Sequence, residues 1–301
     1  MSTHAPGKKV VGLGLAVVDY LLLWQDASRP VAGNRITAFE LQGGGMVGTA
    51  LAAVARLGVA AEFWGAVGAD WMGDRVVADL VAEGIDTSQV RRVEGAVGPL
   101  VVVCVDQPTG ERHFLHFTGR LRPDGPLGDL SRLHDAGCLL IDATQPDSQL
   151  RAAAEAQRLG VPVVGDFGRA QGDVVKLLGH TDYAILSAAC LADADGDPQR
   201  ACRQIRELGP RCVVITLGDR GAVWQDGDDQ GQTPAFAVDV VDTTGCGDVF
   251  HGAFCVGLVE GRTLADNLRF ASAVAALKAT RLGGRAGIPS RSQAADFLAG
   301  N

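Results

Sequence analysis

Residues 138–164 have the sequence CLLIDATQPDSQLRAAAEAQRLGVPVV, in which two short apolar runs flank a segment of helical length. The runs 139–141 and 161–164 are predicted strands, and 149–159 between them is a predicted helix. Further strands are predicted at 183–186 and 213–216, and further helices at 174–178 and 198–208. Such alternation indicates the α/β class: a doubly wound, mainly parallel sheet flanked by helices.

The N-terminal part of the chain adds a segment of β structure to this pattern. Residues 10–19 form a near-continuous apolar run that ends at Asp19, which predicts one strand buried on both faces of the sheet. A strand is predicted at 36–41, and the runs 100–105 and 112–117 flank a Pro/Gly turn and predict a hairpin. We expect one domain over 1–301 with a small β-sheet lid formed by segments about 34–42 and 98–118.

The composition limits the class of partner. The 301 residues carry a formal net charge of -8, whereas nucleic-acid backbones recruit basic faces, so we expect no nucleic-acid partner. No apolar run reaches the roughly 18–20 residues of a membrane span, and the N-terminus lacks a signal-peptide pattern. We expect a cytoplasmic protein with no membrane contact. The seven cysteines form no Cys-x-x-Cys pair and are expected to be buried thiols.

The strongest chemical motif is VDTTGCGDVFHGAF at 241–254, where a predicted strand at 236–241 meets a glycine-rich turn and an apolar helix. Gly245 and Gly247 let the backbone approach an anion, and the first amides of the helix point toward it. A carboxylate beside such an anion hole, here Asp248, can accept a proton from an attacking hydroxyl while the amides hold a transferring phosphoryl group.

Two structural alternatives remain open from the residues. Asp242 or Asp248 could simply cap the helix, although two acids, two threonines and two glycines within 242–248 favour catalysis. The segment 43–48 has the spacing Gly-x-Gly-x-x-Gly of a dinucleotide-binding turn, but the strand before it is partly polar. His251, one turn after Asp248, is expected to be a packing residue of the helix.

Two segments carry a family resemblance. The sequence DTTGCGD at 242–248 resembles the C-terminal signature of the ribokinase-like (PfkB) carbohydrate kinases, and GGMVGTALAAVARLG at 44–58 resembles their N-terminal signature. Both occur in the family's order and at its usual separation, so the likeness covers essentially the whole chain. It implies an ATP- and Mg²⁺-dependent kinase that phosphorylates a hydroxyl of a small sugar (a ketohexose, a pentose or a sugar derivative), with two lids packed together in a homodimer.

The resemblance also implies roles for individual residues. Asp248 corresponds to the catalytic base, and the amides of Gly245, Cys246 and Gly247 correspond to the anion hole. The residues expected to contact the sugar are Asp19, Gly44, Gly45 and Thr49.

The ATP and cation sites are implied in the same way. The sequence TLGDRG at 216–221 resembles the family's nucleotide loop, in which Thr216, Gly218 and Gly221 approach ATP. Asp242 and Thr244 match positions that hold a monovalent cation in several members. The resemblance therefore predicts that K⁺ raises activity relative to Na⁺ or choline.

Two positions depart from the family pattern. The family usually has Asn where this chain has Thr49, whose side chain is shorter and offers only a hydroxyl group for hydrogen bonding. Its Asn-x-x-Glu motif, associated with Mg²⁺ and phosphate, is replaced by Ser-Ala-Ala-Cys at 187–190. Since Mg²⁺ prefers oxygen ligands, we expect it to be held by ATP phosphates and water.

Three alternatives concern the substrate. The C-terminal third, 240–289, resembles sulfofructose kinases most closely, and a sulfonate would need basic partners near the lid; the candidates are Arg35, Arg112, Arg120 and Arg122. A nucleoside kinase of the same family would stack a base on Phe39, Phe114 or Phe117. A non-catalytic sugar sensor would explain the missing Asn-x-x-Glu carboxylate, but it would have no need of Asp248.

Overall fold

The computed structural model describes residues 8–25, 35–106, 112–121 and 125–301, and these form two sheets. The larger sheet has the order β13-β12-β11-β10-β9-β8-β1-β4-β5 and is parallel except for β12 and β13. Its strands are β1 (Lys9–Leu13), β4 (Ala61–Gly68), β5 (Asp86–Val93), β8 (Ala136–Ile141), β9 (Val163–Phe167), β10 (Tyr183–Ser187), β11 (Cys212–Thr216), β12 (Ala222–Asp226) and β13 (Asp229–Thr233). The predicted doubly wound α/β class is confirmed.

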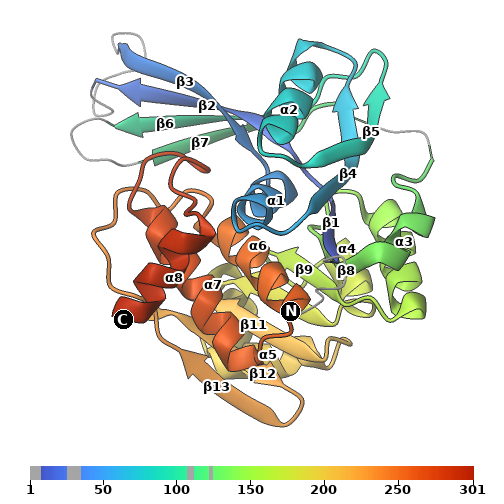
Figure 1. The fold of residues 1–301 in the computed structure, drawn as a ribbon, viewed down its shortest axis with the longest axis vertical. Coiled ribbons are helices and arrows are strands. Elements are labelled where there is room, and N and C mark those ends of the chain that lie inside the picture. Colours follow the sequence, from blue (N-terminus) through green and yellow to red (C-terminus); the bar gives the residue numbers. More distant parts are fainter. Residues whose placement is uncertain (1–7, 26–34, 107–111, 122–124) are drawn as a thin grey trace, which may run out of the picture.

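Helices cover both faces of this sheet (Figure 1). One face carries α1 (Met46–Arg56), α2 (Trp71–Ala82), α6 (Cys246–Val259) and α7 (Leu264–Ala279), with α8 (Arg291–Gly300) packed on α7. The other carries α3 (Pro146–Leu159), α4 (Asp173–Leu178) and α5 (Pro198–Arg206). Short 3₁₀ helices are η1 (Leu130–Asp135), η2 (Ala188–Ala194) and η3 (Gly218–Arg220).

Successive side chains of each strand point to opposite faces of the larger sheet, so the sheet contributes to two hydrophobic cores. Leu140 and Val214 contribute to the cluster under α1, α6 and α7, whereas their neighbours Leu139 and Val213 contribute to the cluster under α3 and α5. All four side chains are fully buried. Strands buried on both faces need continuous apolar runs, which is the pattern seen in the sequence. Among the described residues, no helix is both long and apolar enough to cross a membrane.

The smaller sheet is the lid, with the order β3-β2-β6-β7. Its strands are β2 (Val17–Trp24), β3 (Ile36–Gly44), β6 (Leu100–Asp106) and β7 (Arg112–Phe117). In Figure 1 they extend to one side of the larger sheet, above the red segment that precedes α8. Strand β3 overlaps the segment 34–42, β6 and β7 lie within the segment 98–118, and β2 belongs to the same sheet.

The prediction of a single strand over 10–19 was wrong. The run divides at Gly14: β1 ends at Leu13 in the larger sheet, and β2 begins at Val17 in the lid. The chain is tightly confined where it crosses, because a Cβ on Gly14 would lie 2.4 Å from an Asp142 carboxylate oxygen. Asp19 therefore lies on a lid strand and not at the end of the first strand of the larger sheet.

Three further differences have simple physical causes. Residues 236–241 are not a strand; several of their apolar side chains line a cavity instead of packing in a sheet. The edge strands β5 and β13 are mostly polar and gave no apolar signal. The dinucleotide interpretation of 43–48 was also wrong, because β3, which leads into this segment, is an antiparallel edge strand of the lid.

Candidate active site

The anion loop, residues 242–248, leads into α6. Gly245 is the N-cap residue and has φ 73°, a left-handed conformation that glycine adopts without strain. The amide of Cys246 donates to the carbonyl of Thr243 at 3.1 Å. The other amides of the first turn have no acceptor within the helix, so this end of α6 is suited to an anion.

Asp248 is the third residue of α6 and does not cap it. The N-cap residue is Gly245, so Asp248 does not occupy the capping position, and its carboxyl group lies in the first turn near the positive end of the helix dipole. Burial raises the pKa of Asp248 to about 8, with a further increase from the charge of Asp166 and a partial decrease from His251. Once ionised, such a carboxylate is a much stronger proton acceptor than an exposed one.

Asp166 is a second acid at the same edge of the sheet, and it is buried. It lies on β9, and burial together with the charge of Asp142 raises its pKa to about 8. Its Oδ2 atom is buried without a hydrogen-bond partner among the described residues. Asp142, at the end of β8, is better compensated, since it accepts hydrogen bonds from the Leu15 amide (2.7 Å) and the Gln149 side chain (2.9 Å).

His251 forms a hydrogen bond with the backbone of the anion loop. Its Nδ1 atom lies 2.6 Å from the Gly247 carbonyl, and its Nε2 atom lies 3.3 Å from the Ile185 carbonyl and 3.4 Å from Asp166 Oδ1. Because a carbonyl can only accept, Nδ1 donates to Gly247. Burial lowers the pKa of His251. It is therefore a packing and positioning residue, in agreement with the sequence interpretation.

The lid contributes the opposite side of the site. Asp19 projects from β2, and burial raises its pKa to about 6, an effect that the charge of Arg285 opposes. Gly44 permits this position, because a Cβ there would lie 2.2 Å from an Asp19 carboxylate oxygen. Gly45 follows as the N-cap of α1, and Thr49 is buried in the second turn of that helix.

Arg285 is the basic residue that sequence reasoning missed. The residue is 6% exposed, and its guanidinium donates to the Gly44 carbonyl at 2.9 Å and lies 3.4 Å from the Thr49 hydroxyl. A Cβ on Gly43 or Gly48 would lie within 2.2 or 2.7 Å of its nitrogen atoms. These two glycines thus make room for the guanidinium, whose charge acts on both Asp19 and Asp248.

The arginines proposed from the sequence as partners of a sulfonate are Arg35, Arg112, Arg120 and Arg122. Arg35 and Arg120 are exposed, and the side chains of Arg112 and Arg122 lie outside the described part of the chain. The signal for Arg285 was present as a lone basic residue after Gly283-Gly284. Its contacts with residues some 240 positions away could not be inferred from local pattern.

The predicted nucleotide residues line one cavity of about 540 Å³. Thr216, Gly218 and Gly221 form one wall, and Cys246 and Gly247 of the anion loop form another. The remaining lining is mainly apolar and comes from residues 235–240 and from α7. An apolar cavity that opens onto helix-start amides can hold a base at one end and phosphates at the other.

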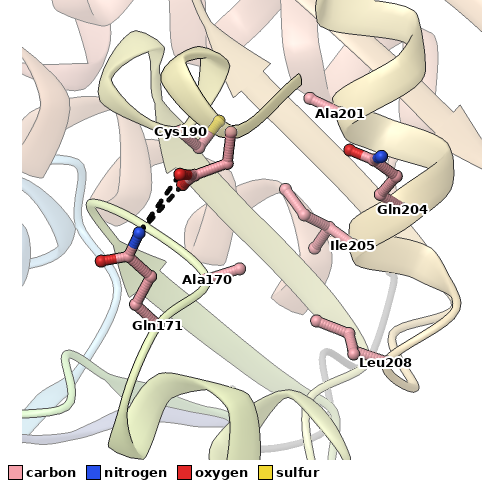
Figure 2. Close-up of a pocket in the computed structure, with 8 residues that line it drawn as sticks. Ala170, Gln171, Cys190, Ala201, Gln204, Ile205 and Leu208 are labelled. Carbon is pink, nitrogen blue, oxygen red and sulfur yellow. Dashed lines mark hydrogen bonds between the residues drawn. The ribbon is translucent and has the colours of Figure 1, made fainter. Parts of the chain in front are cut away.

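The segment 187–190 supplies no substitute for the missing carboxylate. Cys190 faces a separate small hollow of about 170 Å³ beside Gln171 and Ile205 (Figure 2). Burial raises the pKa of the Cys190 thiol to about 11, so it remains protonated and is a poor metal ligand. In the described part of the chain, no group of three or more His, Cys, Asp or Glu side chains could hold a metal ion.

Comparisons with known proteins agree with this geometry. The model of the pfkB family carbohydrate kinases matches residues 8–291. A ribokinase of Haemophilus influenzae is 26% identical over 308 residues, covering 97% of this chain and 98% of its own. An ATP-dependent ribose-1-phosphate kinase of Halopiger xanaduensis is 31% identical and covers 85% of this chain and 86% of its own. The solved structure of a putative ribokinase from Agrobacterium tumefaciens superposes with a TM-score of 0.91 at 29% identity, covering 98% of each chain.

The pKa of Asp248 can be measured directly. In protein labelled with ¹³C at the aspartate carboxyl carbons, with Asp248→Asn to identify the resonance, we expect a titration midpoint of about 8. Asp166→Asn should lower that midpoint, because it removes a repelling charge. A midpoint near the ordinary aspartate value of about 3.9 would show that Asp248 is solvated in the free protein.

Proposed function

The chain belongs to the pfkB family of carbohydrate kinases and is an ATP-dependent sugar kinase, and from this premise we propose that Asp248 is its catalytic base. The proposed acceptor is a hydroxyl group of a small sugar: a ketohexose, a pentose or a sugar derivative. The observation that supports this most strongly is the position of Asp248. It lies half-buried in the first turn of α6, beside the cavity that Gly247 lines and within the electrostatic reach of Asp19 and Arg285.

The proposed reaction is an in-line phosphoryl transfer. The adenine and ribose of ATP would occupy the 540 Å³ cavity, with the phosphates toward the amides of Gly245 and Gly247. Asp248, in its carboxylate form, would accept the proton of the attacking hydroxyl. The fixed amide dipoles would stabilise the charge that develops on the transferred group.

Mg²⁺ supplies charge neutralisation of the ATP phosphates in this type of reaction. We propose that the phosphates and water are its ligands, since the segment 187–190 offers no carboxylate. The buried and unpartnered Oδ2 atom of Asp166 is suited to accept a hydrogen bond from a water molecule of the Mg²⁺ shell. Its role would be to orient that water.

The sugar would bind between the lid and the larger sheet. Asp19 and Arg285 offer a carboxylate acceptor and a guanidinium donor, and Thr49 adds a hydroxyl group. Movement of the lid toward α1 would exclude water and so limit hydrolysis of ATP. This polar set of side chains matches a polyhydroxylated ligand better than it matches a flat aromatic base.

The alternative of a nucleoside kinase requires a phenylalanine of the lid to stack on the base of the nucleoside. Phe39 and Phe117 are 56% and 43% exposed and lie on the two edge strands of the lid, β3 and β7. The side chain of Phe114 lies outside the described part of the chain. Asp248 disfavours the sugar-sensor alternative, because a protein that only binds sugar needs no base beside an anion hole.

A screen of acceptors tests the proposed substrate class. ADP release should be measured with D-fructose, D-ribose, sulfofructose and adenosine, at saturating ATP and Mg²⁺. We expect one sugar class to be clearly preferred over adenosine, because Phe39 and Phe117, which could stack a base, lie exposed on the edge strands of the lid. Preference for adenosine would instead support the nucleoside kinase. Absence of ADP release together with normal sugar binding would support the sensor.

We also propose that two copies of the chain associate through their lids. Ile36 and Phe39 on β3 and Leu115 and Phe117 on β7 are large apolar side chains that are 43–60% exposed. These strands are the two edges of the lid, and exposed apolar edges favour pairing with another chain.

Sedimentation of single-site variants tests this assembly. We expect the wild-type protein to sediment as a dimer at micromolar concentration, and Leu115→Lys to shift it toward monomer by placing a charge in the apolar edge. Val175→Lys on α4 is the matched control, because Val175 is also exposed but lies outside the lid. A wild-type monomer, or equal dissociation of both variants, would contradict a lid interface.

A further inference from the structure

A fully buried lysine lies directly beneath the anion loop. Lys278, in the last turn of α7, has an exposed fraction of 0%. Its Nζ atom donates to the backbone carbonyl of Asp242 at 2.8 Å and lies 3.9 Å from Asp242 Oδ1. Burial of an ammonium group is costly unless it is paired and hydrogen-bonded, so this position requires a specific compensation.

Asp242 provides the compensation and links three segments. Its carboxylate accepts from the Thr244 amide and from the Gly283 amide, both at 2.6 Å. Burial raises the pKa of Asp242, but these two backbone hydrogen bonds and the charge of Lys278 outweigh it and hold the pKa below its ordinary value. An ionised Asp242 therefore joins the anion loop to the end of α7 and to the loop that carries Arg285.

Asp242 and Thr244 are also the residues that the family resemblance led us to expect around a monovalent metal ion. A bound K⁺ requires a shell of oxygen atoms that replaces its hydration water. The backbone carbonyl of Asp242 already accepts a hydrogen bond from the ammonium group of Lys278, which carries the same charge as K⁺. Each oxygen of the Asp242 carboxylate accepts a hydrogen bond from a backbone amide, one of Thr244 and one of Gly283. Thr244 Oγ1 is buried without a hydrogen-bond partner among the described residues. A single hydroxyl oxygen, however, does not provide the coordination shell that K⁺ requires. The residues therefore do not fit K⁺, and the expectation based on Asp242 and Thr244 is replaced.

We infer that the ammonium group of Lys278 is a built-in cation that fixes the anion loop, so that this kinase works without a monovalent metal ion. The inference rests on the proposed role of the anion loop in holding the transferring phosphoryl group. Lys278 acts through Asp242 and is a positioning residue, because it touches the loop and not the reacting atoms.

The first experiment uses the wild-type protein in KCl, NaCl and choline chloride at equal ionic strength. We expect the same kcat and the same melting temperature in all three salts, because the cation is covalently part of the chain. A specific increase of either quantity in K⁺ would overturn the inference. The melting temperature keeps this test valid even if no sugar is phosphorylated, so failure of the proposed function remains distinguishable.

The second experiment removes the ammonium group. Lys278→Met should lower kcat by about 10- to 100-fold, the usual effect of losing a group that orients an active-site ligand. In Lys278→Ala, which leaves a cavity, K⁺ or NH₄⁺ should raise both the melting temperature and kcat relative to choline. Lys176→Met, at an exposed position on α4, is the matched control and should behave as wild type in every salt. Normal kcat for Lys278→Met would contradict the inference. If neither Lys278 variant folds, the inference is tested by the kcat and melting temperature of the wild-type protein in the three salts.

Discussion

Three carboxyl groups, two of them buried and one half-buried, interact electrostatically at the carboxyl edge of the larger sheet, and the arrangement of the site depends on how their charges are compensated. Asp142 directly follows β8, whereas Asp166 lies on β9 and Asp248 on α6. The charge of Asp142 raises the pKa of Asp166, and the charge of Asp166 raises the pKa of Asp248. Asp142 also fixes the crossing between the two sheets, because it accepts from the Leu15 amide and leaves no room for a side chain on Gly14. One buried acid thus positions the lid relative to the base.

The opposing positive charges come from one short segment near the C-terminus. Lys278 lies beneath the anion loop and contacts Asp242, while Arg285 lies between the glycines before and within α1 and contacts the Gly44 carbonyl. Arg56, at the end of α1, donates to the Arg285 carbonyl at 2.7 Å and so fixes the backbone of this loop. Residues 278–285 therefore connect both glycine-rich signatures, which lie about 200 positions apart in the chain.

Sequence pattern predicted those features that depend on neighbours along the chain. The periodicity of 138–216 gave the parallel strands β8 to β11 because each is buried on both faces and must be apolar. The run 10–19 could not reveal that it divides between two sheets, since both halves are apolar and the cause is the distant Asp142. Polar edge strands such as β5 carry no such signal.

The same limit applies to the site. The motif at 242–248 and the loop at 216–221 were predicted to share a ligand, and they line the same cavity. Arg285, Lys278 and Asp166 were not predicted as site residues, because their importance lies in tertiary contacts that no local spacing encodes. The arginines considered from the sequence lie in or beside the lid segments, whereas Arg285, which contacts the Gly44 carbonyl, belongs to the loop before α8.

The proposed role of Asp248 is tested most directly by Asp248→Asn, with kcat and the dissociation constants of ATP and sugar measured on the same preparation. Asn keeps the size of the side chain and removes the proton acceptor, so kcat should fall by about 10²–10⁴-fold. Both dissociation constants and the melting temperature should stay near wild type, because a base acts mainly in the transition state and this side chain does not cap α6. A variant that retains more than about a tenth of the wild-type kcat would contradict the assignment of Asp248 as the base.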